Sequence, residues 1–274
     1  MKRFVEVPGG RIFAVSEGKG PSIVLIHAAI VDLRSWDAVV PGLVQAGFRV
    51  VRYDCRGFGE STTDDVVFSN RADLVAVLDA FGIHRAALVG NSNGGEIAFD
   101  TAIEFPERVV AVVGVGAGLG GYLAKPTPQE KALFGEWARL MSTPELDREK
   151  LVELGVRIWV DGPGQSPHRV SDAIHDAVTE MLRPLMQPNR VEGRSQPLHP
   201  PATDRLKELR CPVLAVTGSL DVSTIPTTAR YLAEKAPNAR AVVMPDVAHM
   251  IGMEAPDKLN ELVVDFLTAL RPWS

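Results

Sequence analysis

The sequence predicts an α/β fold in which a mostly parallel central sheet has helices on both faces and carries a helical cap. Apolar runs of strand length alternate with segments of helical apolar spacing over most of the chain. The alternation stops between residues 118 and 210, where prolines are frequent and the convincing patterns are helical. Hydrophobic residues make up 46 % of the 274 positions, enough for a large core. We therefore expect a core formed by residues 1–117 and 211–274, and a cap formed by 118–210.

The first part of the chain opens with a predicted hairpin. Residues 4–7 and 11–16 alternate in polarity around Pro8-Gly9-Gly10, which favours two antiparallel strands. Continuous apolar runs then predict buried strands at 22–26, 48–53, 85–89 and 109–115. Helices are expected between them at 36–46, where Pro41 is a local irregularity, at 70–81 and at 94–104.

The rest of the chain divides into the cap and the end of the sheet. Within the cap, helical patterns occupy residues 129–141, 148–159 and 171–186. The alternation then resumes, with strands predicted at 213–217 and 241–244 and helices at 225–236 and 254–270.

Composition and charge exclude several classes of protein. The net charge of −5 provides no basic surface for nucleic acid. Cys55 and Cys211 are expected to be free thiols, and no Cys/His cluster has the spacing of a metal site. The longest weakly polar run, 109–124, is Gly-rich and too short to span a membrane, and no apolar signal region follows the N-terminus. We expect a cytoplasmic protein with a small-molecule partner, no metal and no membrane contact. A homodimer stays open.

The stretch around Ser92 is the strongest functional signal. Gly90, Ser92 and Gly94 fit the G-x-S-x-G pattern, in which a serine sits on a sharp turn between a strand and a helix. Such a turn needs small neighbours, and the helix that follows points its first amides at the site. The alternative is a Gly/Asn-rich turn with an incidental serine. The apolar run before it and the helical pattern after it favour the nucleophile.

A serine nucleophile needs an imidazole base and an orienting carboxylate. Among six histidines, His249 follows the last predicted strand and so lies at the carboxyl edge of the sheet, as the serine does. Asp221 follows the preceding strand and completes the chain order Ser…Asp…His. Asp246 is a rival for the carboxylate but is expected to cap a turn, and Glu254 is expected to support the dipole of the last helix. The other histidines are His27, His84, His168, His175 and His199.

The oxyanion that develops during attack needs two hydrogen-bond donors. The turn supplies the backbone N–H of Asn93, and the loop after residues 22–26 supplies a second from Ala29 or its neighbour Ala28.

With these residues in place, the chain resembles the α/β-hydrolase family over nearly its whole length, in the esterase-like branch with a helical cap. Gly90-Asn91-Ser92-Asn93-Gly94 matches the family's nucleophile elbow, and Asp54-x-Arg56-Gly57-x-Gly59-x-Ser61 matches its D-x-R-G-x-G-x-S turn. The segment from His249 to Glu254-x-Pro256 resembles its histidine loop. The resemblance implies no cofactor, a pocket formed by the cap, and Ala29 as the second oxyanion donor. Ala28 stands where the family usually has glycine.

The elbow also resembles that of the C–C bond hydrolases that split ring-cleavage products of aromatic compounds. That resemblance implies that Arg190, preceded by Asn189, binds a carboxylate from the cap. Met250 departs from it, because those enzymes tend to have tryptophan after the histidine.

The expected function is a serine hydrolase that cleaves small to medium carboxylic esters or lactones through an acyl-enzyme on Ser92. The alternatives are a C–C bond hydrolase and a ligand receptor on the same fold that does not turn over. Apolar residues of the cap and of the histidine loop are candidates for the pocket, each with the alternative of plain core packing. The substrate-binding candidates are Ala28, Ile30, Trp137, Trp159, Arg190 and Met250.

Overall fold

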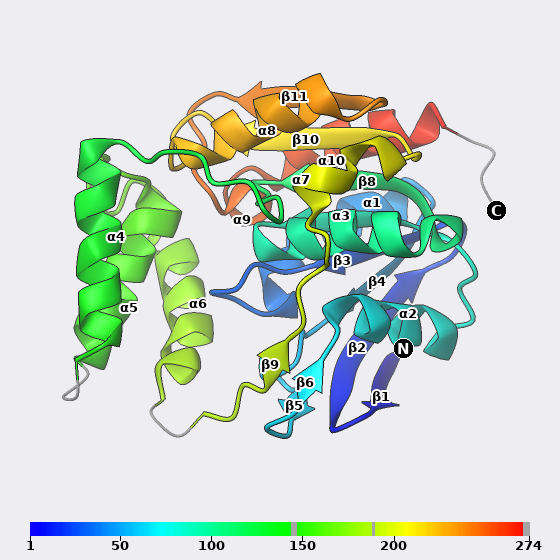
Figure 1. Ribbon diagram of the computed structural model, residues 1–274, viewed down its shortest axis with the longest axis horizontal. Helices are drawn as coiled ribbons and strands as arrows, with labels where there is room; N and C mark the ends of the chain where they lie inside the picture. The colour runs from blue at the N-terminus through cyan, green and yellow to red at the C-terminus, as the bar shows by residue number, and fades with distance from the viewer. Residues whose placement is uncertain (144–146, 188–189, 271–274) are drawn as a thin grey trace.

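The central sheet runs through the whole core of the molecule (Figure 1). The computed structural model describes residues 1–143, 147–187 and 190–270. The main strands lie in the order β1-β2-β4-β3-β7-β8-β10-β11, and only β1 and β2 are antiparallel to their neighbours. The mostly parallel sheet is therefore confirmed. The bounds are β1 (Lys2–Val7), β2 (Gly10–Gly18), β3 (Ser22–Ile26), β4 (Arg49–Tyr53), β7 (Ala86–Asn91), β8 (Val109–Val115), β10 (Val213–Gly218) and β11 (Ala239–Met244).

Helices cover both faces of the sheet because its central strands β3, β7 and β8 are apolar on both sides. In β3, Val24 and Ile26 belong to one hydrophobic cluster, while Ile23 and Leu25 belong to another. The first cluster is completed by α2 (Asn70–Ala80), α3 (Asn93–Glu104) and α8 (Thr224–Lys235). The second is completed by α1 (Val40–Gln45) and α10 (Pro256–Thr268). Alternate side chains thus enter separate cores above and below the sheet.

Two predicted helices are interrupted at prolines. The segment 36–46 contains the last residue of a 3₁₀ turn, η1 (Leu33–Trp36), and then α1, in which Pro41 occupies the first turn. The segment 254–270 contains the last residue of α9 (Ile251–Glu254) and then α10, which begins at Pro256. Proline lacks an N–H group and fits the first turn of a helix, and each of these prolines lies in the first turn of a helix where a single longer helix was expected.

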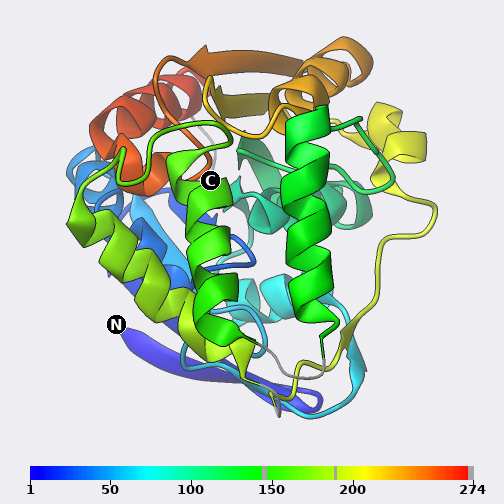
Figure 2. The ribbon, with the colours of Figure 1, turned by 90° about the vertical axis from the view of Figure 1, so that its left-hand side faces the viewer.

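The helical cap lies over the carboxyl ends of the parallel strands, at the left of Figure 1, and faces the viewer in Figure 2. It contains α4 (Pro128–Met141), α5 (Arg148–Val156) and α6 (Asp172–Leu182). The helix predicted at 148–159 changes at Arg157 into a π-helical turn, η3 (Arg157–Asp161). The pattern at 171–186 ends in a 3₁₀ turn, η4 (Arg183–Met186).

The chain then runs back past the sheet through α7 (Ala202–Arg205) and η5 (Leu206–Glu208). On this path β9 (Arg194–Ser195) pairs with β6 (Val67–Phe68), and β5 (Thr62–Thr63) pairs with β2. The sequence did not predict these strands, because two residues show no period.

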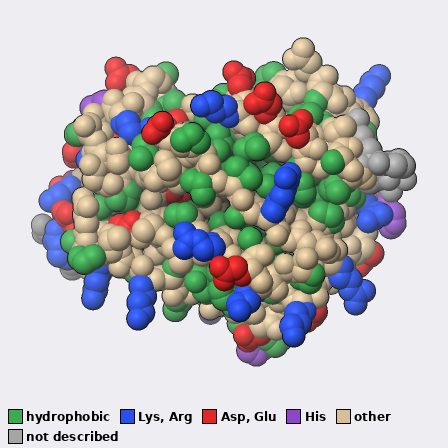
Figure 3. All heavy atoms as spheres, turned by 90° about the horizontal axis from the view of Figure 1, so that it is seen from above, with side chains coloured by type: hydrophobic (Ala, Val, Ile, Leu, Met, Phe, Trp, Pro, Cys, Tyr) green, Lys and Arg blue, Asp and Glu red, His purple; other side chains and the backbone are tan. Residues whose placement is uncertain are grey.

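The described surface mixes apolar and charged groups. On the face seen in Figure 3, hydrophobic side chains are interspersed with basic and acidic ones. No helix within the described residues is long and apolar enough to cross a membrane.

Candidate active site

The turn between β7 and α3 holds Ser92 in a strained backbone conformation. Its φ is 54° and its ψ is −117°, a backbone conformation that residues other than glycine rarely adopt. Gly90 and Gly94 are required because neighbouring backbone atoms leave no room for a side chain at either position. A Cβ atom on Gly90 would lie 2.1 Å from the backbone oxygen of Gly94, and one on Gly94 would lie 2.3 Å from that of Ile26. The side chain of Ser92 is thereby placed at the start of α3, above the carboxyl end of the sheet.

His249 and Asp221 form a buried pair at the same edge of the sheet. The Nδ1 atom of His249 lies 2.9 Å and 3.0 Å from the two carboxylate oxygens of Asp221. Their side chains are 2 % and 0 % exposed. The carboxylate also accepts the N–H of Val222 at 2.7 Å. With Nδ1–H donated to Asp221, Nε2 is the nitrogen of His249 that can take up a proton.

Asn91 and Gly116 bring the histidine loop against the serine turn. The amide Nδ2 of Asn91 donates to the backbone oxygens of Val115, at 2.8 Å, and His249, at 3.3 Å. The N–H of Ser92 donates to the same Val115 oxygen at 2.9 Å. A Cβ atom on Gly116 would lie only 3.2 Å from Nδ1 of His249. Sequence analysis assigned no role to either residue, although Asn91 precedes the serine directly.

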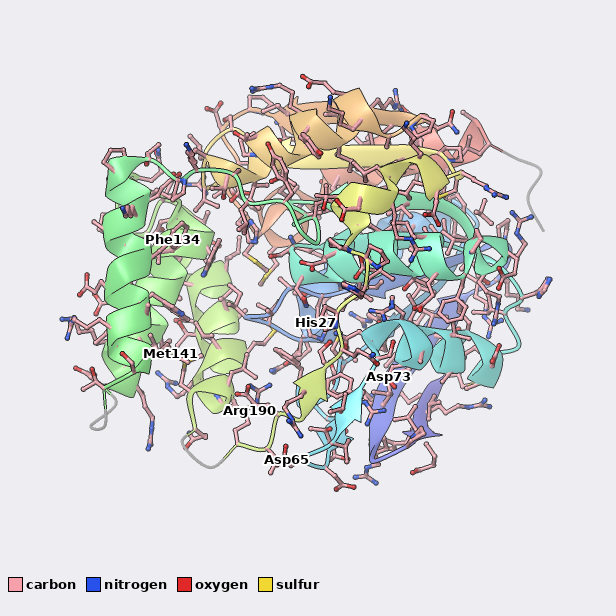
Figure 4. All side chains as sticks on the ribbon, in the orientation of Figure 1. His27, Asp65, Asp73, Phe134, Met141 and Arg190 are labelled. Carbon is pink, nitrogen blue, oxygen red and sulfur yellow. The ribbon has the colours of Figure 1, made fainter. Side chains whose placement is uncertain are left out.

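The loop after β3 carries the second candidate oxyanion donor, and His27 holds it in place. His27 donates from Nδ1 to the oxygen of Ala28 at 2.8 Å and accepts the N–H of Cys55 on Nε2 at 2.9 Å. Burial lowers the pKa of His27, so the ring stays neutral in this role. Figure 4 shows it in the interior of the molecule. Ala29, the next residue, is exposed, as is Asn93 at the start of α3.

The D-x-R-G-x-G-x-S turn forms hydrogen bonds with the loop after β3. Arg56 forms a buried pair with Asp73, at 2.6 Å and 2.8 Å. Asp54 accepts the N–H groups of Leu33 and Glu60, both at 2.8 Å. Burial raises the pKa of Asp54 to about 7. The contacts of this turn are structural and fix the segment that holds His27.

The rivals for the catalytic roles have other partners. His175 lies 2.9 Å from the buried carboxylate of Asp161. Asp246 is exposed, with a φ of 61°, and its N–H donates to the hydroxyl of Ser219. Glu254 does not support the dipole of the last helix. It lies at the end of α9, pairs with Arg169 and accepts the N–H of Ala248, so the prediction for Glu254 was wrong.

The π-helical turn places Trp159 on the histidine. The ring centres of Trp159 and His249 are 4.9 Å apart. Phe134 of α4 stacks on Trp159, with the ring centres 5.9 Å apart. Turns of this kind occur often at functional sites. Trp137 packs within the cap against Gly155 of α5.

The remaining apolar candidates gather between the loop after β3 and the cap. Ala28 and Met250 are each 1 % exposed and share one cluster with Val160. Ile30 is partly buried and packs on that cluster. These residues form an apolar surface next to Ala29, one of the two candidate oxyanion donors.

Arg190 lies between the cap and the core, near β9 (Figure 4). Its guanidinium donates to the oxygen of Gly57 at 2.9 Å and to Glu192 at 2.8 Å, and lies over the ring of Phe58. It lines a cavity of about 240 Å³ together with Asn93. The preceding Asn189 lies outside the described residues. Among the described residues, no group of three or more His, Cys, Asp or Glu side chains is placed to hold a metal ion.

Comparisons with known proteins find hydrolases among the relatives of this chain. The sequence profile of the family described as "Alpha/beta hydrolase family" matches residues 23–262. A 2-hydroxy-6-oxononadienedioate/2-hydroxy-6-oxononatrienedioate hydrolase of Burkholderia vietnamiensis is 31 % identical, over 90 % of this chain and 86 % of its own. A 2-hydroxy-6-oxo-6-phenylhexa-2,4-dienoate hydrolase of Burkholderia cepacia is 30 % identical, over 94 % and 91 %. The solved structure of an N-acyl homoserine lactone degrading enzyme covers 96 % of this chain and all (100 %) of its own, with 26 % identity and a TM-score of 0.70.

Proposed function

This chain belongs to the α/β-hydrolase family and is a hydrolase, and from that premise we propose that it cleaves small to medium carboxylic esters or lactones through an acyl-enzyme on Ser92. The observation that carries the proposal is the buried pair of His249 and Asp221. A hydrogen bond from the side chain of Asn91 to the backbone oxygen of His249 joins the histidine loop to the turn that carries the strained Ser92. Each part has the environment that activation of a serine hydroxyl requires.

The proposed reaction proceeds in two halves. Nε2 of His249 takes the proton of the Ser92 hydroxyl as its oxygen attacks the substrate carbonyl, and Asp221 stabilises the imidazolium that forms. The N–H groups of Ala29 and Asn93 bind the negative oxygen. The intermediate collapses to an ester on Ser92, and His249 gives its proton to the departing alkoxide. A water molecule then attacks this ester, with His249 again as base, and releases the acid and the free serine.

The chemistry of the surrounding residues supports a substrate with an apolar acyl or alcohol part. Met250 and Ile30 supply aliphatic and thioether groups on one side. Trp159 supplies an aromatic wall against the base. Small side chains at Ala28 and Ala29 leave room beside the oxyanion donors. The lactone-degrading structural relative supports including lactones in the substrate class.

A C–C bond hydrolase is the second candidate, and two observations favour it. The relatives at 30 % and 31 % identity are hydrolases of oxo-dienoates. Arg190 lines the same cavity as Asn93, where a carboxylate of such a substrate would find a cation. Against it, the guanidinium already donates to Gly57 and Glu192.

The two candidates are separated by substrate and by variant. We expect the protein to hydrolyse p-nitrophenyl acetate and butyrate with many turnovers, and a fluorophosphonate to label Ser92. Ser92→Ala abolishes both, whereas Ser171→Ala, which alters an exposed serine of the cap whose side chain makes no capping hydrogen bond, leaves both intact. Absence of labelling in folded protein at any pH overturns the serine mechanism. Turnover of an oxo-dienoate that Arg190→Gln reduces, with no ester turnover, selects the C–C hydrolase.

A further inference from the structure

Arg169 joins the cap to the loop that carries His249. It lies between η3 and α6, and its side chain is 17 % exposed. On the cap side it donates to the backbone oxygens of Val160, at 3.1 Å, and Asp161, at 2.8 Å. On the core side it donates to the oxygen of Asp246 at 3.2 Å and to both carboxylate oxygens of Glu254. One side chain therefore binds four groups on two parts of the molecule.

Glu254 connects Arg169 to the residue directly before His249. Its carboxylate is 11 % exposed and accepts the N–H of Ala248 at 3.0 Å, from the residue directly before His249. Arg169 holds Asp246, at the other end of this short loop, through its backbone oxygen. The loop 246–249 is thus fixed at both ends by one ion pair.

The same link fixes the turn that carries Trp159. Val160 and Asp161, whose oxygens Arg169 binds, follow Trp159 within η3. The ring of Trp159 lies on that of His249. An arginine suits this position, because its planar group directs five N–H donors in fixed directions, which a lysine cannot reproduce.

We propose that Arg169 and Glu254 are positioning residues for His249, and that they make the alignment of the base depend on the docking of the cap. This inference rests on the proposed function, in which His249 is the base. The residues do not touch substrate. They act by keeping the main chain at Asp246 and Ala248 where the imidazole contacts Asp221 and, in the proposed mechanism, serves Ser92.

A merely structural ion pair would affect stability and leave the chemistry unchanged. A positioning pair lowers kcat while KM stays the same, because a misplaced base slows the reaction and not the binding of substrate. The chain offers a matched control in Arg183, which pairs with Glu149 on the exposed side of the cap. Arg183→Met removes an arginine–glutamate pair of the same kind far from the histidine loop.

The test compares Arg169→Met, Glu254→Gln, the double variant and Arg183→Met. We expect each of the first two to lower kcat for p-nitrophenyl butyrate about 10- to 100-fold, with KM within about twofold. The double variant is no worse than the poorer single one, because both changes break one link. Arg183→Met retains wild-type kcat. Arg169→Lys restores less than half of the lost rate.

Hydrogen exchange provides a readout that does not depend on ester turnover. We expect the amides of residues 246–250 to exchange at least tenfold faster in Arg169→Met than in the wild type or in Arg183→Met. Unchanged exchange overturns the link even if the protein hydrolyses no ester. In an active enzyme, an unchanged kcat or losses that multiply in the double variant also overturn it. If Arg169→Met does not fold, Arg169→Lys and Glu254→Gln carry both measurements.

Discussion

Replacing Asp221 by asparagine tests the proposed site with little change in shape. In the native protein, one carboxylate oxygen accepts the N–H of Val222 at 2.7 Å, and both face Nδ1 of His249. In the variant, the amide oxygen is held by Val222, and its NH₂ group is left facing the imidazole. The ring then has to present an unprotonated Nδ1, which puts its proton on Nε2. A histidine in that tautomer cannot take the proton of Ser92.

The expected loss follows from this change of tautomer. The wrong tautomer in a Ser-His-Asp site lowers kcat by about 10⁴-fold. That factor corresponds to about 5.5 kcal/mol of activation free energy, at about 1.36 kcal/mol for each factor of ten. The burial of the pair supports the full effect, because side chains that are 2 % and 0 % exposed have no water to replace the lost acceptor.

The assay is the hydrolysis of p-nitrophenyl butyrate under saturating conditions, with the rate of fluorophosphonate labelling as a second measure. Asp246→Asn is the control, because it removes an exposed carboxylate from the histidine loop itself. We expect its kcat within about twofold of the wild type, as for most surface changes. If Asp221→Asn keeps more than a tenth of the native kcat, the tautomer argument is refuted. Equal losses in the two variants would refute the choice of carboxylate.

Three further predictions concern packing, pH and the aromatic wall. Gly94→Ala should destabilise the protein by about 1–3 kcal/mol in urea unfolding, because its Cβ would lie 2.3 Å from a backbone oxygen of β3; Gly135→Ala, in open space on α4, should stabilise it by up to about 1 kcal/mol. Burial raises the pKa of Asp100 to about 7 from 3.8, so the folded chain binds more protons between these values and the free energy of unfolding falls as pH rises through that window. The free energy of unfolding of Asp100→Asn, relative to that of the wild type, should therefore be higher at pH 8 than at pH 4. A difference between the two proteins that stays the same from pH 4 to pH 8 would contradict this. Trp159→Leu should raise KM for phenyl acetate about fivefold and leave KM for ethyl acetate unchanged, since an aromatic pair contributes about 1 kcal/mol; an equal rise for both esters would count against the aromatic wall.

The fold could be predicted because its core strands are apolar on both faces. The runs at 22–26 and 109–115 correspond residue for residue to β3 and β8, where burial is nearly complete. The failures are local. Pro41 was taken as an irregularity inside a helix, but it lies in the first turn of α1. The helix expected from residue 254 begins only at Pro256. The π-helical turn after Val156 has the composition of an ordinary helix, so no pattern distinguishes it.

The positions of candidate site residues could be predicted where the order of strands and helices along the chain determines them. Asp221 and His249 follow adjacent parallel strands, so their meeting follows from the topology. The partners that hold them in place were not predictable, because they come from distant segments. Arg169 and Glu254 are 85 positions apart, and their pairing depends on how the cap sits on the sheet. Glu254 was therefore assigned from its nearest helix, which proved wrong.

The cap is inserted between two strands that lie side by side. β8 and β10 pair directly, with Val112 opposite Val213, although the whole cap separates them in sequence. The hydrogen bonds between β8 and β10 depend on the backbones of these two strands and not on the length of the segment inserted between them. Evolution, or an engineer, can therefore lengthen, shorten or exchange the cap and obtain a new pocket while the scaffold of the reaction stays in register. If Arg169 has the proposed role, a cap that keeps an arginine at this place should also keep His249 in position.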